Sequence, residues 1–552
     1  MHRTPRRTGR PVTMAPRGLV VAPHYLATEA GVWIMRQGGN AVDAAVAASA
    51  VLSVVYPHLA GLGGDVLAMV WDPRRGEPIC LNGSGHSGYQ ARIGFYTERG
   101  YQAVPERGAL AANTVPGAVA AWGDLHDRWG ALDWERLLEP AIGYAADGFP
   151  VSANLARWLL RGRQLLEGDT YARQVFLRDG ETYGEGEVLV QADLAQTLRT
   201  LAGEGPEAFY RGELAGTIVS GLRRRGGLLL AQDLEDHHSD WVDPLSTPYR
   251  DCTLYEFPPN AQGAAASLML NLLEGWDIAS LGDHSAEYYH LLAEAAKVVI
   301  ADVDQHLADP NFFAAPLGLL LSKEYAARRR QAIPAARAQE VSVYRSGALV
   351  PADARREVPG AGAGTAYLAT ADASGLAVSL VQSLHREFGA GVVAGNTGVL
   401  LQSSGTSFSL EPADPNRLEP HKRPSAALIP AMLFRGGHPW MPFGSSGGQI
   451  QPQVHATLVT RTVDLGYDVQ EAIEAPRVLY GRLWDEPAPT LHVEGWVPDS
   501  VLRQLREMGH EVRLVDDWSD QMGQAQAIIV DREHHAFHGG ADPRGDGAAA
   551  GW

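Results

Sequence analysis

The pattern of the chain changes abruptly at Thr365, and this change constrains the fold more than any other feature. Residues 341–364 contain two prolines and end in the run GAGAG, a composition typical of an accessible, flexible loop. Residues 365–371 then look like a strand, residues 372–375 (DASG) carry the Asp and Gly of a tight turn, and residues 376–384 look like a returning strand. We therefore predict a pair of strands that begins directly behind a protease-accessible loop.

The step from Gly364 to Thr365 can be interpreted chemically as well as structurally. A threonine hydroxyl is a poor nucleophile unless a base lies beside it, and a chain-terminal threonine supplies that base with its own α-amino group. This group has a pKa of about 8, which suits general-base catalysis at neutral pH. Thr365 gains such an amine only if the chain is cut before it, and Gly364 permits the strained backbone that an N-to-O acyl shift needs. Taken alone, such a step is more often just the start of a strand.

Helices and glycine turns accompany this region. Asn40 can cap a helix over residues 40–55, which is rich in Ala and Val on every side and is therefore expected to be buried. The turn GLGG (61–64) precedes a strand over residues 66–71. At 552 residues the chain is too long for one ordinary core, so we expect two or more core layers. Further segments with helical character are residues 134–146, 286–306 and 325–340, the last expected to be exposed.

Composition argues against several classes of protein. The net charge of −18 disfavours a nucleic-acid partner, because phosphate binding needs a basic face. Two cysteines do not make a disulfide framework. No apolar run approaches the roughly 18 residues that span a bilayer, and no apolar signal-peptide core follows the basic N-terminus. We therefore expect a cytoplasmic protein without a membrane partner, in which residues 1–17 form a disordered leader.

Several motifs occur in a fixed order along nearly the whole chain. They are GGNAVDAAV (38–46), GLGG (61–64), TVPG (114–117), PAI and DGF (within 140–149), KRP (422–424), GG (447–448), EAPR (474–477) and ADPR (541–544). Together with the step at Thr365, this order resembles the γ-glutamyltransferase family of N-terminal-nucleophile enzymes.

The resemblance implies an α+β fold, a four-layer αββα sandwich formed jointly by two chains cut from one. Autocatalytic cleavage would fall between Gly364 and Thr365. It would leave a large chain, residues 18–364 with a flexible pre-cleavage loop over about 341–364, and a small chain, residues 365–552. The expected product is an αβ heterodimer, with further dimerisation left open.

The resemblance also assigns catalytic roles by position. Thr365 matches the nucleophile, and Ser383 matches a threonine whose hydroxyl bonds the new α-amino group. Gly447 and Gly448 match the backbone donors of the oxyanion hole. Paired glycines let the backbone approach a reacting carbonyl, and a nearby helix N-terminus favours negative charge. Without the resemblance, the glycine pair is equally well explained as an ordinary turn.

Most of the side chains that bind glutamate in the family are missing. The family arginine that grips the α-carboxylate falls at or near Ser84, and the aspartate that holds the α-amino group falls at Ser407. A serine pair becomes Ala426 and Ala427. A zwitterion bound without these charges costs several kcal/mol of desolvation. We therefore expect a non-glutamyl acyl group, as in divergent members such as oxamate amidohydrolases and cephalosporin-acylase-like enzymes.

Other residues are candidates for binding a small carboxylate or another acyl group. His385 stands at a family asparagine position near the substrate, whereas Arg386 is equally well explained as a solvated loop charge. The full candidate set for substrate binding is His385, Ser404, Ser407, Gln402, Ser84 and His86. The histidines at 237–238 and within 534–538 lack supporting metal-ligand spacing, so we expect no metal and no cofactor.

Three functions remain open at this point. The first is an autoprocessing amidohydrolase or acyltransferase that acts on a small-molecule, non-glutamyl amide through an acyl-enzyme on Thr365. The second is a conventional γ-glutamyltransferase that hydrolyses glutathione. The third is a non-catalytic relative that never cleaves, which the joint presence of Thr365, Ser383, Gly447 and Gly448 disfavours.

Overall fold

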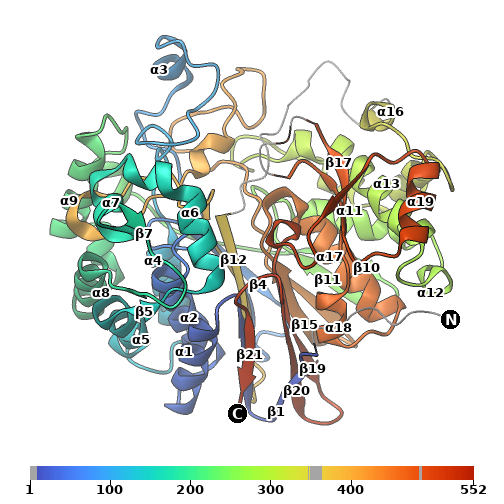
Figure 1. Ribbon diagram of the computed structural model, residues 1–552, viewed down its shortest axis with the longest axis horizontal. Helices are drawn as coiled ribbons and strands as arrows, with labels where there is room; N and C mark the ends of the chain where they lie inside the picture. Colours follow the sequence, from blue (N-terminus) through green and yellow to red (C-terminus); the bar gives the residue numbers. More distant parts are fainter. Residues whose placement is uncertain (1–8, 346, 349–363, 484–485, 487) are drawn as a thin grey trace.

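Two seven-stranded sheets lie face to face between two groups of helices (Figure 1). A computed structural model describes all residues except 1–8, 346, 349–363, 484–485 and 487. Within the described part, one apolar core fills the space between the sheets. A second core lies between one sheet and its helices, and a third lies between the other sheet and its helices. The layer order is therefore αββα, which confirms the predicted fold class.

The first sheet, here called the nucleophile sheet, contains the strand pair predicted behind Thr365. β12 and β13 pair antiparallel at its centre, around the predicted turn at 372–375. The sheet order is β21 (Ala548–Gly551), β2 (Gly18–Ala22), β12 (Gly364–Asp372), β13 (Ala377–His385), β3 (Asp65–Trp71), β4 (Ile79–Gly83) and β9 (Asp240–Val242).

The second sheet, here called the facing sheet, mixes strands from both sides of Thr365 in the same way. Its order is β1 (Thr13–Ala15), β20 (Ala536–Ala541), β19 (Ala525–Asp531), β15 (His438–Ser445), β14 (Ala431–Arg435), β11 (Cys252–Glu256) and β10 (Leu245–Tyr249). Both sheets therefore interleave the large segment (18–364) with the small segment (365–552), and their ladders would hold the segments together after a cut.

Alternation along β12 decides which side chains face the interior between the sheets. Tyr367 and Ala369 belong to the core between the sheets, whereas Ala366 and Leu368 belong to the core under the helices. Since successive side chains of a strand point to opposite faces, Thr365 also points toward the facing sheet. Burial on both faces explains why β12 is almost entirely apolar or small.

Helices that pack on the nucleophile sheet include the buried helix predicted over residues 40–55. It is α2 (Ala41–Val55), whose residues are all buried and whose first turn is closed by a capping box between Asn40 and Asp43. The same layer holds α1 (Tyr25–Arg36), α4 (Ala118–Trp129), α5 (Trp134–Asp147), α6 (Ala153–Glu167), α8 (Ala192–Glu204) and α9 (Gly212–Arg223). The α5 helix confirms the prediction for residues 134–146.

The other helical layer covers the facing sheet (Figure 1). It holds α11 (Gly263–Leu273), α13 (Ala286–Asp302), α17 (Gln451–Val459), α18 (Val469–Glu474) and α19 (Asp499–Glu507). The predicted helix over 286–306 is α13 followed by a short 3-10 turn, Asp304–His306.

Three sequence-based predictions are wrong at their edges. The helix expected over 325–340 is α15 (Lys323–Arg330); Pro334, which lacks a backbone N–H, follows it, and Arg329 is buried against Asp302 rather than exposed. The loop expected over 341–364 begins with a helix, α16 (Val341–Arg345), and ends with Gly364 already in β12. Residues 13–15 of the expected disordered leader form β1, paired with β20. The rest of the expected loop at 346 and 349–363 and of the leader at 1–8 lies outside the described residues.

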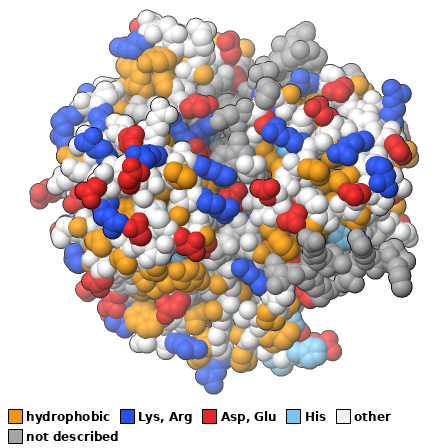
Figure 2. All heavy atoms as spheres, viewed as in Figure 1, with side chains coloured by type: hydrophobic (Ala, Val, Ile, Leu, Met, Phe, Trp, Pro, Cys, Tyr) orange, Lys and Arg blue, Asp and Glu red, His pale blue; other side chains and the backbone are white. Residues whose placement is uncertain are grey.

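The visible surface is mixed in charge. Figure 2 shows acidic and basic side chains interspersed among hydrophobic and neutral ones on the face that it draws. Among the described residues, no helix combines the length and apolar character needed to cross a membrane.

Candidate active site

The hydroxyl of Thr365 lies beside the peptide bond that precedes it. Gly364 and Thr365 follow one another in β12, so the structure describes the uncut chain. Thr365 is opposite Ser383 of β13, and the ladder is irregular at this step. Ser383 Oγ lies 3.2 Å from Thr365 Oγ1 and donates to the Gly364 carbonyl oxygen at 2.5 Å.

Counting protons fixes the direction of these bonds. A carbonyl oxygen only accepts, so the single proton of Ser383 Oγ goes to Gly364 O. Ser383 Oγ then accepts from the His385 backbone N–H at 2.8 Å and from Thr365 Oγ1. The Gly364 carbonyl is thereby polarised by a hydroxyl donor while the Thr365 hydroxyl is held next to it. This is the arrangement that an attack of Oγ1 on the preceding carbonyl needs.

Position 364 has no room for any residue larger than glycine. A Cβ built at this position would lie 2.3 Å from the Arg386 carbonyl oxygen, closer than real atoms approach. The backbone that directly follows β13 therefore runs against the bond before Thr365. This close approach explains the glycine that ends the GAGAG run.

The glycine pair 447–448 forms the turn that follows β15. Gly447 has φ 116° and Gly448 has φ 59°, backbone conformations that favour glycine. β15 lies so close to β12 that a Cβ at Gly444 would be 2.4 Å from the Tyr367 ring. Because Tyr367 is two residues from Thr365, this contact places the turn toward the start of β12. Gln262 fixes the turn by donating to the Gly448 carbonyl at 2.8 Å.

Asp65 lies beside Ser383 on the next strand, so that Thr365, Ser383 and Asp65 form a row across β12, β13 and β3, here called the inter-sheet row. Ser383 pairs directly with Asp65 of β3, and directly paired residues share a face of the sheet. Asp65 is 2% exposed. It accepts from the Gly85 backbone N–H at 2.9 Å and from Gln402 Nε2 at 3.0 Å. Three polar side chains thus line one edge of the inter-sheet space.

Ser404 links Asp65 to Gln402, and the proton count there is informative. Ser404 Oγ lies 3.0 Å from Asp65 Oδ2 and 2.5 Å from Gln402 Oε1, yet it has one proton. Both contacts are hydrogen bonds only when Asp65 carries a proton and donates it to Ser404. Burial is the main cause that raises the pKa of Asp65 to about 6, against the hydrogen bonds that lower it. The sequence indicated Gln402 and Ser404 as candidates but not Asp65. Its one indication in the sequence was a charged residue at the start of an otherwise apolar strand.

Replacing Asp65 with asparagine is expected to stabilise the protein above pH 6. The folded-state pKa lies above its unfolded value, so stability from this group is full below about pH 4 and is lost as pH rises to about 6. An asparagine reproduces the neutral, donating form at every pH. Between pH 4.5 and 7.5, the variant should gain about 2 kcal/mol relative to the wild type in urea unfolding.

The matched control is Asp72→Asn. Bonds from Arg74 lower the pKa of Asp72 to about 2, so its carboxylate stabilises the fold at both pH values, and this variant should lose stability at both. An equal effect of Asp65→Asn at pH 4.5 and 7.5 would contradict the assignment of the proton.

Ser84 and His86 lie in a buried cluster beside this row. The Ser84 hydroxyl is bonded to Asn82 Oδ1 at 2.7 Å, and Arg423 Nε donates to the Ser84 carbonyl at 2.9 Å. Arg423 is itself paired with Asp240. The Ser84 hydroxyl therefore supports the scaffold, and the guanidinium that contacts the Ser84 carbonyl is already paired with a carboxylate. The His86 ring stacks on His421 with centroids 4.4 Å apart.

His385 and Arg386 follow Ser383 at the end of β13. Burial, with Arg386 and Arg107 nearby, lowers the pKa of His385 to about 3, so its imidazole is neutral and can hold a substrate only by hydrogen bonding. Arg386 pairs with Glu106 at 2.8 Å. Ser407 ends the 3-10 turn that begins at Ser404, and its carbonyl accepts from Asn416. The structure thus gathers Thr365, Ser383, Gln402 and Ser404 around the inter-sheet row.

Comparison with known proteins matches this chain along its whole length. The family model described as Gamma-glutamyltranspeptidase matches residues 27–552. The Glutathione hydrolase-like YwrD proenzyme of Bacillus subtilis is 43% identical over 97% of this chain and 98% of its own. The Oxamate amidohydrolase proenzyme of Klebsiella pneumoniae is 36% identical over 98% and 99%. The crystal structure of cephalosporin acylase from Bacillus halodurans superposes with a TM-score of 0.90 at 34% identity, covering 100% of this chain and 99% of that one.

Proposed function

Because the chain belongs to the γ-glutamyltranspeptidase family of amide-bond hydrolases and transferases, we propose that Thr365 is both the site of self-cleavage and the catalytic nucleophile. The proposal rests on the position of Ser383, whose Oγ contacts Thr365 Oγ1 and donates a hydrogen bond to the Gly364 carbonyl. Two of the similar proteins are named proenzymes, which supports cleavage of a precursor. The interleaved sheets would keep the products together as an αβ heterodimer.

The proposed cleavage begins with attack of Thr365 Oγ1 on the Gly364 carbonyl carbon. Ser383 stabilises the negative charge that develops on the carbonyl oxygen. The carbon–nitrogen bond breaks, and the hydroxyl proton passes to the nitrogen, which becomes the α-amino group of Thr365. Water then hydrolyses the Gly364 ester, which leaves a free carboxylate on Gly364 and a free hydroxyl on Thr365.

After cleavage, the free α-amino group of Thr365 lies beside its own Oγ1, where the peptide bond to Gly364 was before. It takes the hydroxyl proton as Thr365 attacks the substrate amide, and it returns the proton to the leaving amine. The amides of Gly447 and Gly448 would stabilise the oxyanion, a contribution of about 3 kcal/mol per donor. The acyl group remains on Thr365 as an ester until water or an acceptor amine removes it.

We propose that the acyl group is a small carboxylate or another non-glutamyl acyl chain. Ser84 has no charge, its hydroxyl is bonded to Asn82, and His385 is neutral, so these positions provide no cation for an α-carboxylate. Ser407 provides no anion for an α-ammonium. Ser404 Oγ lies between Asp65 Oδ2 and Gln402 Oε1, and its one proton could instead be donated to an acceptor on the substrate. Relatives named oxamate amidohydrolase and cephalosporin acylase agree with this choice.

A comparison of amide substrates tests this choice. We expect kcat/KM for oxamate or a glutaryl amide to exceed that for γ-glutamyl anilide by at least about tenfold, a difference of about 1.4 kcal/mol. The Thr365→Ala chain is the blank. The name of the relative described as glutathione hydrolase-like supports the alternative, glutathione hydrolysis. Faster turnover of the γ-glutamyl anilide would establish that alternative and overturn the proposed acyl group.

A further inference from the structure

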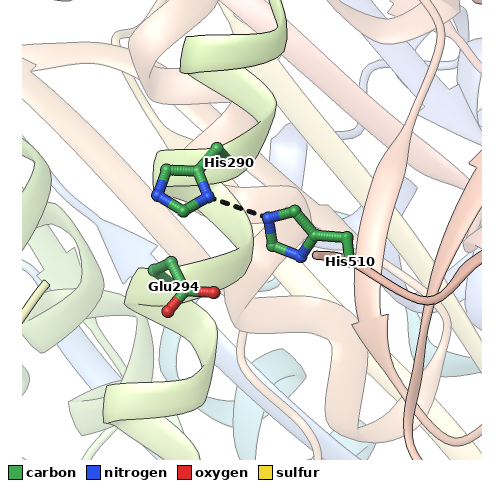
Figure 3. A group of neighbouring side chains, drawn as sticks. All are labelled: His290, Glu294 and His510. Atoms are coloured by element: carbon green, nitrogen blue, oxygen red, sulfur yellow. Dashed lines mark hydrogen bonds between the residues drawn. The ribbon is translucent and has the colours of Figure 1, made fainter. Parts of the chain in front are cut away.

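Three buried side chains suited to metal binding meet where the large segment contacts the small one. His290 and Glu294 lie one turn apart on α13, and His510 reaches them from the residues before β18 (Val512–Val515) (Figure 3). One ligand atom from each residue lies within 4.8 Å of the others, and all three residues are buried. His290 and His510 are 220 positions apart, so no spacing pattern in the sequence could join them.

The partners of His290 determine its tautomer. Its Nε2 lies 2.7 Å from the Pro334 carbonyl oxygen, which only accepts, so the ring proton is on Nε2. The Nδ1 of neutral His290 is then a lone pair, and His510 Nε2 donates to it across 2.8 Å. Metal-binding histidines usually donate their other ring N–H to a carbonyl or carboxylate. His290 therefore already has the orientation and tautomer of a ligand.

Glu294 is held in place by three donors and retains coordinating capacity. Its Oε1 accepts from Lys297 at 2.7 Å, and its Oε2 accepts from Tyr344 at 2.5 Å and from the Gln339 backbone N–H at 3.2 Å. A carboxylate has about four lone-pair sites, so one remains. An incoming cation must compete with the Lys297 ammonium. Lys297 also donates to the Gln339 carbonyl at 2.8 Å, a bond that it can keep.

We propose that His290, Glu294 and His510 bind a divalent transition-metal ion such as Zn²⁺. Two imidazoles and a carboxylate are a ligand set that zinc accepts. Binding requires the His510 ring proton to move from Nε2 to Nδ1, so that both facing nitrogens offer lone pairs. Nitrogens about 2.0 Å from a tetrahedral zinc lie about 3.3 Å apart, so the two rings need to separate by about half an ångström.

The ion would join the large chain to the small chain after cleavage. His290 and Glu294 belong to the large segment, and His510 belongs to the small one. Pro334, Gln339 and Tyr344, which contact these ligands, lie on the stretch that leads toward the cleavage site. The metal would therefore anchor residues 334–344 of the large chain, a structural role that does not depend on Thr365.

Titration of the chelator-treated protein with Zn²⁺ tests the site. We expect one equivalent bound per chain in calorimetry, a rise of the thermal midpoint, and the same result for the uncut Thr365→Ala chain. His510→Gln and Glu294→Gln should each weaken binding at least about tenfold, since even the loss of a residue that only orients a metal ligand typically costs that much. His534→Gln, an exposed histidine beside Asp531, is the control and should bind like the wild type.

A second measurement does not depend on any variant. Co²⁺ added to the wild type should give the visible absorption bands of a nitrogen- and oxygen-coordinated ion, and Zn²⁺ should displace them. Absence of these bands, or Zn²⁺ binding that persists unchanged in both His510→Gln and Glu294→Gln, would overturn the proposal.

Discussion

Replacing Thr365 with alanine is expected to leave the chain uncut and to abolish turnover. The variant lacks the hydroxyl that, in the proposed mechanism, attacks the Gly364 carbonyl and later the substrate amide, so both reactions should fail together. Loss of a catalytic hydroxyl nucleophile typically lowers kcat by about 10⁶-fold. Denaturing gels over several days measure the cleavage, and release of the amine from a substrate amide measures the turnover.

Two further variants distinguish the role of the nucleophile from that of the neighbouring hydroxyl. Thr365→Ser keeps the hydroxyl and should still be cut. Ser383→Ala removes the donor to the Gly364 carbonyl, and cleavage should slow by about 10²- to 10³-fold without stopping. Cleavage of Thr365→Ala at the same bond, or turnover by it at the wild-type rate, would contradict the role of Thr365.

Replacing Glu494 with glutamine is expected to destabilise the fold by about 3–5 kcal/mol, because it leaves a buried guanidinium without its main counter-ion. Glu494 accepts two bonds from Arg544, at 2.7 and 2.6 Å, and both side chains are fully buried. Arg544 also contacts Asp542, which in turn pairs with Arg477. Urea unfolding of the Thr365→Ala background measures the change without interference from cleavage.

Two comparisons make this prediction specific. Glu167→Gln, which removes an exposed partner of Arg163, should change stability by less than about 0.5 kcal/mol. Removing both Glu494 and Arg544 with apolar residues of similar size should recover much of the loss. Equal stability of Glu494→Gln and the wild type would show that the network contributes little.

The central strand pair and the buried helix were predictable because each depends on local pattern. Thr365 lies at the beginning of a strand, the DASG turn reverses the chain, and the Ala/Val-rich helix α2 is apolar on every side. No distant partner was therefore needed to interpret these elements. The fold class was predicted from the order of the short motifs, because that order showed the resemblance to the family. The motifs EAPR and ADPR, unexplained in the sequence, meet in the structure as the network of Arg477 with Asp542 and Arg544.

Features that depend on which strands become neighbours were not predictable. Asp65 joins the site because β3 lies next to β13, a choice of partner made across more than 300 residues. The meeting of His290 with His510 likewise depends on the packing of α13 against the small segment. The errors at the edges have two causes. Pro334 follows the end of α15, and β1 gains its order from β20, a strand more than 500 residues away.

An intact-mass spectrum of the freshly purified wild-type protein under denaturing conditions tests the central claim most directly. We expect two species in equal amounts, with the smaller matching residues 365–552 and beginning with an unblocked threonine. A single uncut chain that nevertheless hydrolyses amides, or a small fragment that begins at any other residue, would contradict the assignment of Thr365.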